Sequence, residues 1–296
     1  MPELPEAETI RRQLEAEVTG KTVRRLELLH PRAWRAHTSP KELADLVEGR
    51  RIVRVGRRGK APYLLLNSKR PSVLIFRLGM TGLVRVAKVT RRAGASAPAP
   101  FRAAGAEAEP SALRAVLTLT GGRELRFYDQ RLFGELVAFP THDVDNTPEF
   151  AHYGPEPFSG EFTLDYLKDH LSRRSAKLVD VLMNQQIVAG IGKIYSDEAC
   201  FRAGVRPGRR AWSVTGPMRE RLWRAIREVL SVGIEARGSS AKDETFRDVY
   251  GIPGRFQDRM QVYQRTGQPC RVCGTPIKRA RIASGRGMHW CPKCQK

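Results

Sequence analysis

The stretch CRVCGTPIKRARIASGRGMHWCPKC (residues 270–294) contains two Cys-x-x-Cys pairs with 17 residues between them. Each pair can place two thiolates on one side of a tight turn, and two such pairs complete a tetrahedral four-sulfur shell for zinc. We therefore expect one structural Zn²⁺ bound by Cys270, Cys273, Cys291 and Cys294, because four protein ligands leave no open position for chemistry. The alternative is a set of redox-active or free thiols.

The residues between the two pairs, KRARIASGRGMH (278–289), are basic and rich in glycine. This composition favours a small hairpin that can reach a phosphate group. The fifth cysteine, Cys200, lies on a helix-like segment and is expected to be a small buried residue. Four of the five cysteines fall within the last 27 residues, which is not typical of a secreted disulfide framework.

The chain is strongly basic, with 52 Lys and Arg against 31 Asp and Glu, a formal net charge of +21 and a pI of about 10.5. Such a charge favours a polyanionic partner, and nucleic acid is the first candidate. Solvated surface charge is the alternative, whereas a membrane-surface protein is disfavoured because no long amphipathic basic helix or lipidation signal is evident. The sequence shows no signal-peptide pattern and no apolar run near the roughly 18 residues that span a bilayer, so we expect the protein to stay in the cytoplasm.

The N-terminal residues MPELPEAETIRRQL predict a helix over residues 5–18, in which Ile10, Leu14 and Val18 recur on one face. Methionine before a small residue is usually removed, which would leave the secondary amine of Pro2 at the terminus. An α-amino group titrates near pH 7.7, so a neutral and nucleophilic fraction exists under cellular conditions. Pro2 is therefore a candidate nucleophile, and the alternative is a proline that merely begins a helix.

The first half of the chain alternates apolar and polar residues in short runs, which predicts a β-sandwich or barrel. A Gly-Gly pair at 121–122 predicts a tight hairpin between two of these runs. The segment 91–112 is rich in Ala, Pro and Gly and predicts a long loop. The expected strands lie within residues 21–30, 51–56, 62–67, 72–79, 83–89, 112–120, 123–129 and 136–139.

The second half has helical periodicity after a breaker-rich segment at 141–160. Thr163 is a candidate helix cap, and AGIGK (189–193) joins two helical segments through a glycine turn that could present backbone amides to a phosphate. The expected helices lie within residues 162–171, 176–190, 193–204 and 217–237.

Together these motifs resemble the formamidopyrimidine-DNA glycosylase and endonuclease VIII family of base-excision repair. The matching motifs run in family order over nearly the whole chain: PELPE (2–6), RRGK (57–60), LGMTG (78–82), DQRLFG (129–134), GPEP (154–157), VAGIGKIYSDE (188–198) and the cysteine-rich end. The resemblance implies an α+β multidomain protein with an N-terminal helix and β-sandwich, a helix-two-turn-helix domain and a C-terminal zinc-finger hairpin, with DNA bound between the lobes. The corresponding divisions are a catalytic domain at 1–140, a linker at 141–160, a DNA-binding helical domain at 161–245 and a zinc-finger region at 246–296.

The resemblance also implies roles for the residues that match the family's catalytic motifs. Pro2 would attack C1′ of the damaged nucleotide, and Glu3 would transfer protons during sugar-ring opening. Lys60 would bind phosphate beside the lesion and assist strand cleavage, although a hairpin lysine is commonly only solvated. Arg286 would clamp the flanking phosphates, because a guanidinium fork suits phosphate. Glu6 is expected at the DNA site as well, with a helix-dipole role as the alternative.

Extrusion of a base leaves a hole in the duplex that side chains must fill. By resemblance the three void fillers are Met80, Arg131 and Phe133, whereas without it Met80 and Phe133 would be ordinary loop or core residues. Arg174 lies where the family carries a basic phosphate contact, with a surface charge as the alternative. Lys193 replaces the family's asparagine and keeps the capacity to bind phosphate.

Three positions depart from the family pattern. Val179 stands in place of a lysine, Arg77 in place of a histidine before LGMTG, and Lys193 in place of the asparagine. Leu4 matches PELPE of the formamidopyrimidine branch rather than PEGPE of the endonuclease VIII branch. The predicted function is therefore a monomeric bifunctional DNA glycosylase and abasic-site lyase for oxidised purines in duplex DNA. The alternatives are an endonuclease VIII-like enzyme for oxidised pyrimidines or abasic sites, and a noncatalytic damage-binding protein.

Overall fold

The computed structural model describes residues 2–67, 69–88, 110–240, 246–282 and 285–296. It divides into two compact units, one formed by residues 1–151 with 237–255, and the other by residues 152–236 with 256–296. Residues 237–255 thus group with the N-terminal unit, whereas the divisions proposed from sequence follow chain order and stay predictions. Among the described residues, no helix is long and apolar enough to cross a membrane.

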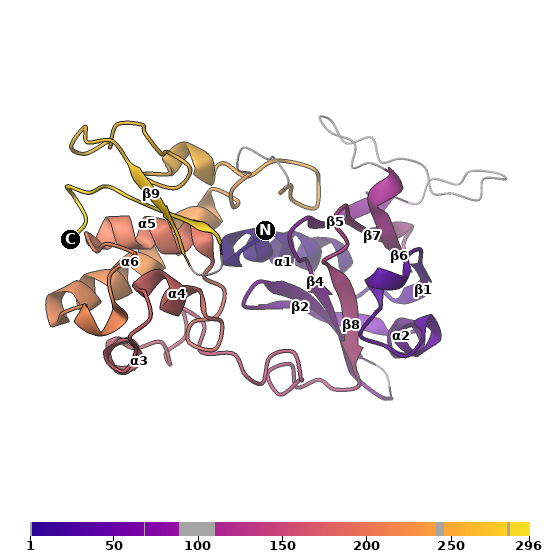
Figure 1. Cartoon of the computed structure of the whole chain (residues 1–296). Helices are drawn as coiled ribbons and strands as arrows, with labels where there is room; N and C mark the ends of the chain where they lie inside the picture. The colour runs from indigo at the N-terminus through magenta and orange to yellow at the C-terminus, as the bar shows by residue number, and fades with distance from the viewer. Residues whose placement is uncertain (1, 68, 89–109, 241–245, 283–284) are drawn as a thin grey trace. The chain divides into compact units, whose positions relative to one another are not determined.

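The first unit contains two four-stranded antiparallel sheets, ordered β1-β6-β7-β5 and β2-β3-β4-β8 (Figure 1). The predicted β-sandwich is therefore confirmed, including the hairpin at Gly121 and Gly122, which both take positive φ between β6 and β7. Most of segment 91–112 lies outside the described residues. The strands are β1 (Val23–Leu28), β2 (Arg51–Arg58), β3 (Ala61–Asn67), β4 (Ser72–Arg77), β5 (Gly82–Lys88), β6 (Leu113–Leu119), β7 (Arg123–Asp129) and β8 (Glu135–Phe139).

Helix α1 (Leu4–Val18) packs against β2 and β3 and supplies Ile10, Leu14 and Val18 to the sandwich core. All three side chains are fully buried, and burial of one aliphatic side chain contributes about 1.5–3 kcal/mol. The helix that fixes the N-terminus is thus part of the core.

A second helix, α2 (Pro40–Val47), was not predicted, although the sequence carries its signals. Ser39 accepts a hydrogen bond from the backbone N–H of Glu42, and a proline occupies the first turn. Two short 3₁₀ turns are η1 (Pro31–Ala33) and η2 (Pro110–Ala112).

The second unit contains the predicted helices, with Thr163 capping the first through the N–H of Tyr166. The helix predicted over 176–190 ends early at Met183, and two turns follow before Gly192 caps the next helix. Two antiparallel strands form the basic hairpin. The elements are α3 (Leu164–Ser172), α4 (Leu178–Met183), α5 (Lys193–Ala203), η3 (Ala211–Ser213), α6 (Gly216–Glu235), η4 (Phe256–Arg259), β9 (Lys278–Arg281) and β10 (Gly287–Trp290).

Candidate active site and nucleic-acid interface

The N-terminal segment is held in place by the start of α1. Pro2 and Glu3 are both buried, and Glu3 is the N-cap residue of the helix. The backbone N–H of Glu3 donates a 2.8 Å hydrogen bond to Oε2 of Glu6, which forms a capping box. The residue next to the candidate nucleophile is therefore fixed by a hydrogen bond.

Glu6 is 1% exposed. It also contacts residues 238–239, which belong to the same unit but lie far along the chain. Its Oε1 accepts a 2.6 Å hydrogen bond from the backbone N–H of Ser239. Gly238 takes φ +78°, and a Cβ there would lie 2.7 Å from Cγ of Glu6, so the approach requires glycine. Glu6 thus joins the N-terminus to residues 238–239, and its expected contact with DNA stays a prediction.

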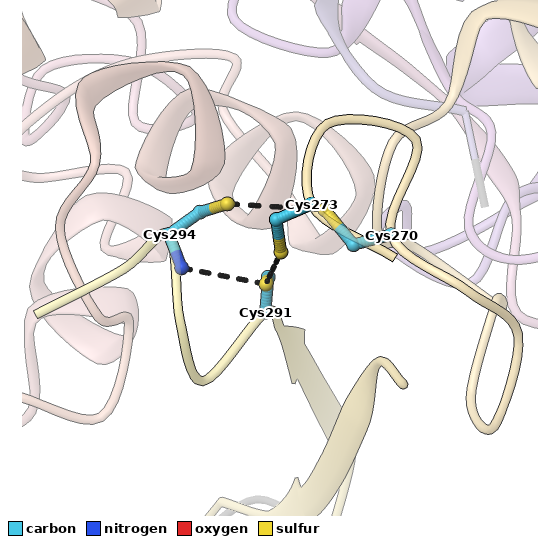
Figure 2. A group of neighbouring side chains, drawn as sticks. All are labelled: Cys270, Cys273, Cys291 and Cys294. Atoms are coloured by element: carbon cyan, nitrogen blue, oxygen red, sulfur yellow. Dashed lines mark hydrogen bonds between the residues drawn. The ribbon is translucent and has the colours of Figure 1, made fainter. Parts of the chain in front are cut away.

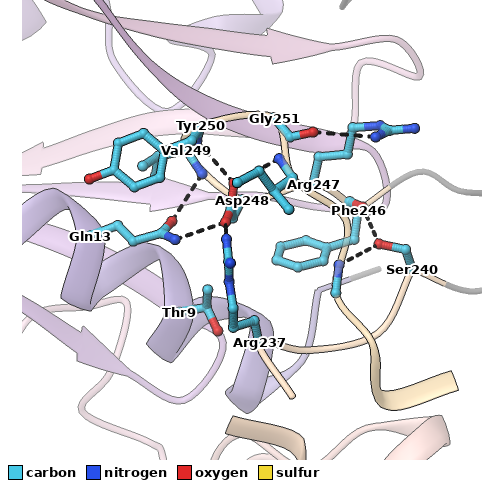
Figure 3. Close-up of polar contacts among 12 residues, drawn as sticks. Thr9, Gln13, Arg237, Ser240, Phe246, Arg247, Asp248, Val249, Tyr250 and Gly251 are labelled. Atoms are coloured by element: carbon cyan, nitrogen blue, oxygen red, sulfur yellow. Dashed lines mark hydrogen bonds and ion pairs between the residues drawn. The ribbon is translucent and has the colours of Figure 1, made fainter. Parts of the chain in front are cut away.

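Asp248 anchors the segment after residue 245 to α1 (Figure 3). This fully buried carboxylate accepts hydrogen bonds from the side-chain amide of Gln13 at 2.8 Å and from the N–H groups of Tyr250 and Ile252, and it pairs with Arg237. Sequence reasoning missed this cluster, because its members come from opposite ends of the chain.

Lys60 occupies the turn between β2 and β3, directly after Gly59 with φ +57°. The guanidinium of Arg57 donates to the Gly59 carbonyl at 2.7 Å and, through Nε, to Oε2 of Glu8 on α1 at 3.2 Å. The turn that carries Lys60 is therefore tied to α1, the helix that follows Pro2.

The three predicted void fillers lie on two loops and are all exposed. Met80 is 40% and Phe133 47% exposed, so neither side chain is packed in the core. The guanidinium of Arg131 lies over the ring of Phe133, 5.1 Å from its centroid. The exposure of these three side chains agrees with their predicted role as void fillers, which stays a prediction.

The two loops are linked through Asp129, which is 1% exposed. Its carboxylate accepts the hydroxyl of Thr81, the N–H of Arg131 at 3.3 Å and the N–H of Gly134 at 2.6 Å. Gly79 takes φ +56°, and a Cβ there would lie 2.8 Å from the Gly134 nitrogen. The first loop therefore needs glycine to approach the second so closely.

Arg77, which replaces the family's histidine, belongs to an ion-pair cluster at the end of β4. It donates to Oε1 of Glu135 at 2.6 Å and, through Nε, to Glu149 at 2.7 Å. The positive charge of Arg77 is therefore paired with carboxylates of the protein itself.

Lys193 is 7% exposed at the start of α5 and forms an ion pair with the fully buried Asp197. The second oxygen of Asp197 accepts the N–H of His289 at 2.9 Å and lies 3.0 Å from its Nδ1. Val179 is also fully buried, in an apolar cluster with Met288 and other residues of the hairpin. Lys193 and Val179, two of the three departures from the family pattern, thus join the helices to the hairpin. The DNA contact predicted for Lys193 stays a prediction.

The two remaining predicted phosphate contacts differ in exposure. Arg286 is exposed at the turn between β9 and β10, and its carbonyl accepts the N–H of Ile282. Arg174 is half-buried after α3, donates to the carbonyl of His170 at 2.7 Å, and lines a cavity of about 480 Å³ with Arg173.

The four C-terminal cysteines converge on one point (Figure 2). Their sulfur atoms all lie within 4.8 Å of one another, with Cys270 and Cys294 at 3.9 Å and Cys273 and Cys291 at 3.4 Å. Zn–S bonds of about 2.3 Å place tetrahedral sulfurs about 3.8 Å apart, so the group fits one Zn²⁺. Cys200 is buried elsewhere, as predicted, and burial raises the pKa of its thiol.

Three family models match successive parts of the chain. The formamidopyrimidine-DNA glycosylase N-terminal domain matches residues 1–136, the H2TH domain of the same glycosylase matches 153–245, and a zinc finger found in FPG and IleRS matches 267–296.

Curated relatives and solved structures agree with these models. A formamidopyrimidine-DNA glycosylase of Symbiobacterium thermophilum is 41% identical, covering 100% of this chain and 89% of that protein, and one of Thermus thermophilus is 40% identical, covering 100% and 98%. The crystal structure of MutM (Fpg) from Thermus thermophilus matches with a TM-score of 0.83 at 39% identity, over 99% of this chain and 98% of that one. A complex of Lactococcus lactis Fpg with DNA containing an abasic site matches with a TM-score of 0.84 at 30% identity, over 99% of both chains.

Proposed function

The chain belongs to the formamidopyrimidine-DNA glycosylase family, and from this we propose that it excises oxidised purines, such as 8-oxoguanine and formamidopyrimidines, from duplex DNA and then cleaves the abasic site. The observation that carries the proposal is the fixed N-terminus, in which the buried Pro2 and Glu3 precede a helix braced by Glu6. A nucleophile at a rigid position needs no further ordering before it attacks. Relatives are bacterial, so we expect the chain to act on the chromosome in the cytoplasm.

In the proposed reaction the nitrogen lone pair of Pro2 bonds to C1′ while the C1′–N bond to the damaged base breaks. The base leaves with that electron pair and takes up one proton, and the Pro2 nitrogen gives up its own proton, which restores the lone pair that later forms the iminium. Glu3 then gives a proton to O4′ as the sugar ring opens to an iminium intermediate. Loss of a C2′ proton expels the 3′ phosphate, and loss of a C4′ proton in a second elimination, through the conjugated iminium, expels the 5′ phosphate. Lys60 and Arg286 would hold these phosphates.

The zinc ion has a structural part in this proposal. When bound by the four cysteines it crosslinks the two ends of segment 270–294, and its filled coordination shell supplies no reactive position. The chain's own residues would thereby hold Arg286 at the tip of the hairpin.

Borohydride trapping on duplex DNA with an abasic site tests the nucleophile. Reduction converts the iminium into a stable crosslink, so the wild type should be trapped, and Pro2→Gly should retain DNA binding but lose most trapping. Pro40→Ala is the matched control, because Pro40 is an exposed proline in the first turn of α2. Unchanged trapping by Pro2→Gly would reassign the nucleophile to a lysine, and active protein that retains Met1 would contradict the mechanism.

A noncatalytic damage-binding protein is the second candidate, favoured by Val179 and Lys193, which are both buried where the family pattern has other residues. Tight binding to an abasic duplex without any crosslink would support it. A cleavage panel of duplexes with 8-oxoguanine, formamidopyrimidine, thymine glycol or an abasic site separates purine from pyrimidine specificity.

A further inference from the structure

Arg35 reaches from the segment between η1 and α2 to the loop that carries two of the predicted void fillers. Its Nη1 donates a 3.2 Å hydrogen bond to the carbonyl of Leu132, and its Nη2 donates a 2.9 Å bond to the carbonyl of Phe133. A guanidinium can serve two successive carbonyls because its N–H groups form a rigid fork. One side chain thus holds the backbone between Arg131 and Gly134.

The backbone held in this way is strained at Leu132, which takes φ +59° although it carries a side chain. A left-handed conformation is unfavourable for residues other than glycine and persists only where the surroundings enforce it. Leu132 lies between Arg131 and Phe133, so its conformation sets the relative direction of these two exposed side chains. Arg35 donates its hydrogen bonds to the carbonyls of Leu132 and Phe133, the first two carbonyls after this strained φ angle in the chain.

Arg35 is itself anchored on the sandwich. Its Nε lies 3.3 Å from Oε2 of Glu135, a carboxylate only 3% exposed, whose other oxygen accepts from Arg77. The chain around Arg35 is fixed to β8 as well, because Nε2 of His37 accepts the N–H of Ala138 at 3.1 Å. The guanidinium of Arg35 is therefore held in position by contacts with β8.

We propose that Arg35 is a positioning residue for base extrusion: it holds Leu132 in the left-handed conformation and thereby presents Arg131 and Phe133 to the duplex. The inference rests on the proposed function, since those two side chains matter only where a base leaves the stack. Arg35 does not touch the reacting atoms. Its loss should therefore affect substrates that require extrusion and spare those that do not.

The test compares Arg35→Ala with Arg32→Ala, at an exposed arginine in the neighbouring 3₁₀ turn Pro31–Ala33. Single-turnover excision of 8-oxoguanine from a duplex should slow at least about tenfold in Arg35→Ala, whereas cleavage of a single-stranded abasic oligonucleotide, which has no base to extrude, should stay within about twofold. Arg35→Ala with Leu132→Gly should recover most of the duplex rate, because glycine takes positive φ without strain. Arg35→Lys should not, because one ammonium lacks the fork.

Hydrogen exchange of residues 129–135 gives a readout that does not need activity. Exchange should rise in Arg35→Ala, because the two hydrogen bonds to the carbonyls of Leu132 and Phe133 are lost. Unchanged exchange, an equal loss on both substrates, or absence of rescue by glycine would overturn the proposal. A wild type that is inactive on both substrates while the exchange behaves as expected would instead count against the proposed function.

Discussion

The carboxylate of Asp197 on α5 accepts a 2.9 Å hydrogen bond from the backbone N–H of His289 on β10. The same carboxylate pairs with Lys193 one helical turn earlier. Its neighbour Glu198 accepts the N–H groups of Gln261, Val262 and Tyr263, so two consecutive acidic residues bind the helical domain to the zinc-finger region.

Removal of one partner of the buried Lys193–Asp197 pair should be costly. Asp197→Asn leaves an unpaired ammonium and should destabilise the second unit by about 3 kcal/mol, whereas Lys193→Asn with Asp197→Asn should cost less than the sum of the two single changes. Urea unfolding of all four proteins gives the coupling energy. The matched control is the exposed Arg224–Glu220 pair on α6, for which the same cycle should give at most about 0.5 kcal/mol. Additive effects at Lys193 and Asp197 would contradict the ion pair.

Removal of zinc should unfold the last 30 or so residues and leave the sandwich intact, because the fold of this end depends on the four thiolates. Hydrogen exchange after chelation should lose protection in β9 and β10 but not in β1–β8, and DNA binding should weaken. Cys273→Ser should lower zinc content, whereas Cys200→Ala, at a buried cysteine outside the group, should keep one equivalent. Full hydrogen-exchange protection of the hairpin in metal-free protein would contradict a structural role for zinc.

The carboxylate of Glu8, which pairs with Arg11, Arg12 and Arg57, predicts a pH dependence of stability. Burial raises the pKa of Glu8, but hydrogen bonds from Arg11 and Arg12 outweigh it, so the pKa lies below its usual value of 4.5. A lowered pKa contributes stability that is present above the unfolded value and is lost as pH falls through the folded value. Glu8→Gln should therefore destabilise by about 1 kcal/mol at about pH 7, and the difference should shrink as the pH falls below 4.5.

Urea unfolding at about pH 7 and at a series of lower pH values checks this prediction. Glu15→Gln is the control, because Glu15 pairs with Arg11 at an exposed position and should change stability by less than about 0.5 kcal/mol. A Glu8→Gln difference that persists in acid would show that packing, rather than charge, is responsible.

The regular elements could be predicted because their signals are local. Alternating apolar residues indicated the strands, Thr163 indicated a helix start, and the spacing of Cys270 and Cys273 from the second pair indicated zinc. The helix at Pro40–Val47 was missed although its cap and proline are local too, because only eight residues carry the pattern.

The contacts that hold the site could not be predicted in the same way. Arg77 contacts Glu135, 58 residues later in the chain, and Glu149, 72 residues later. These contacts form only after the strands have paired. Glu6 meets Ser239 across 233 residues. The pairing of Lys193 with Asp197 was different, because the i,i+4 spacing of opposite charges on a predicted helix was visible in the sequence.

The final prediction separates two of the cationic residues expected at phosphates, Arg286 and Lys193. Binding to duplex DNA should weaken steeply with salt, and each phosphate contact contributes a slope of about 0.9 in a plot of log affinity against log salt concentration. Arg286 is exposed, so Arg286→Ala should lower the slope by about 0.9. Lys193→Asn should leave the slope unchanged, because the Lys193 ammonium is buried against Asp197. Titrations at several salt concentrations measure both, and a reduced slope for Lys193→Asn would show that this lysine leaves its carboxylate partner to bind DNA.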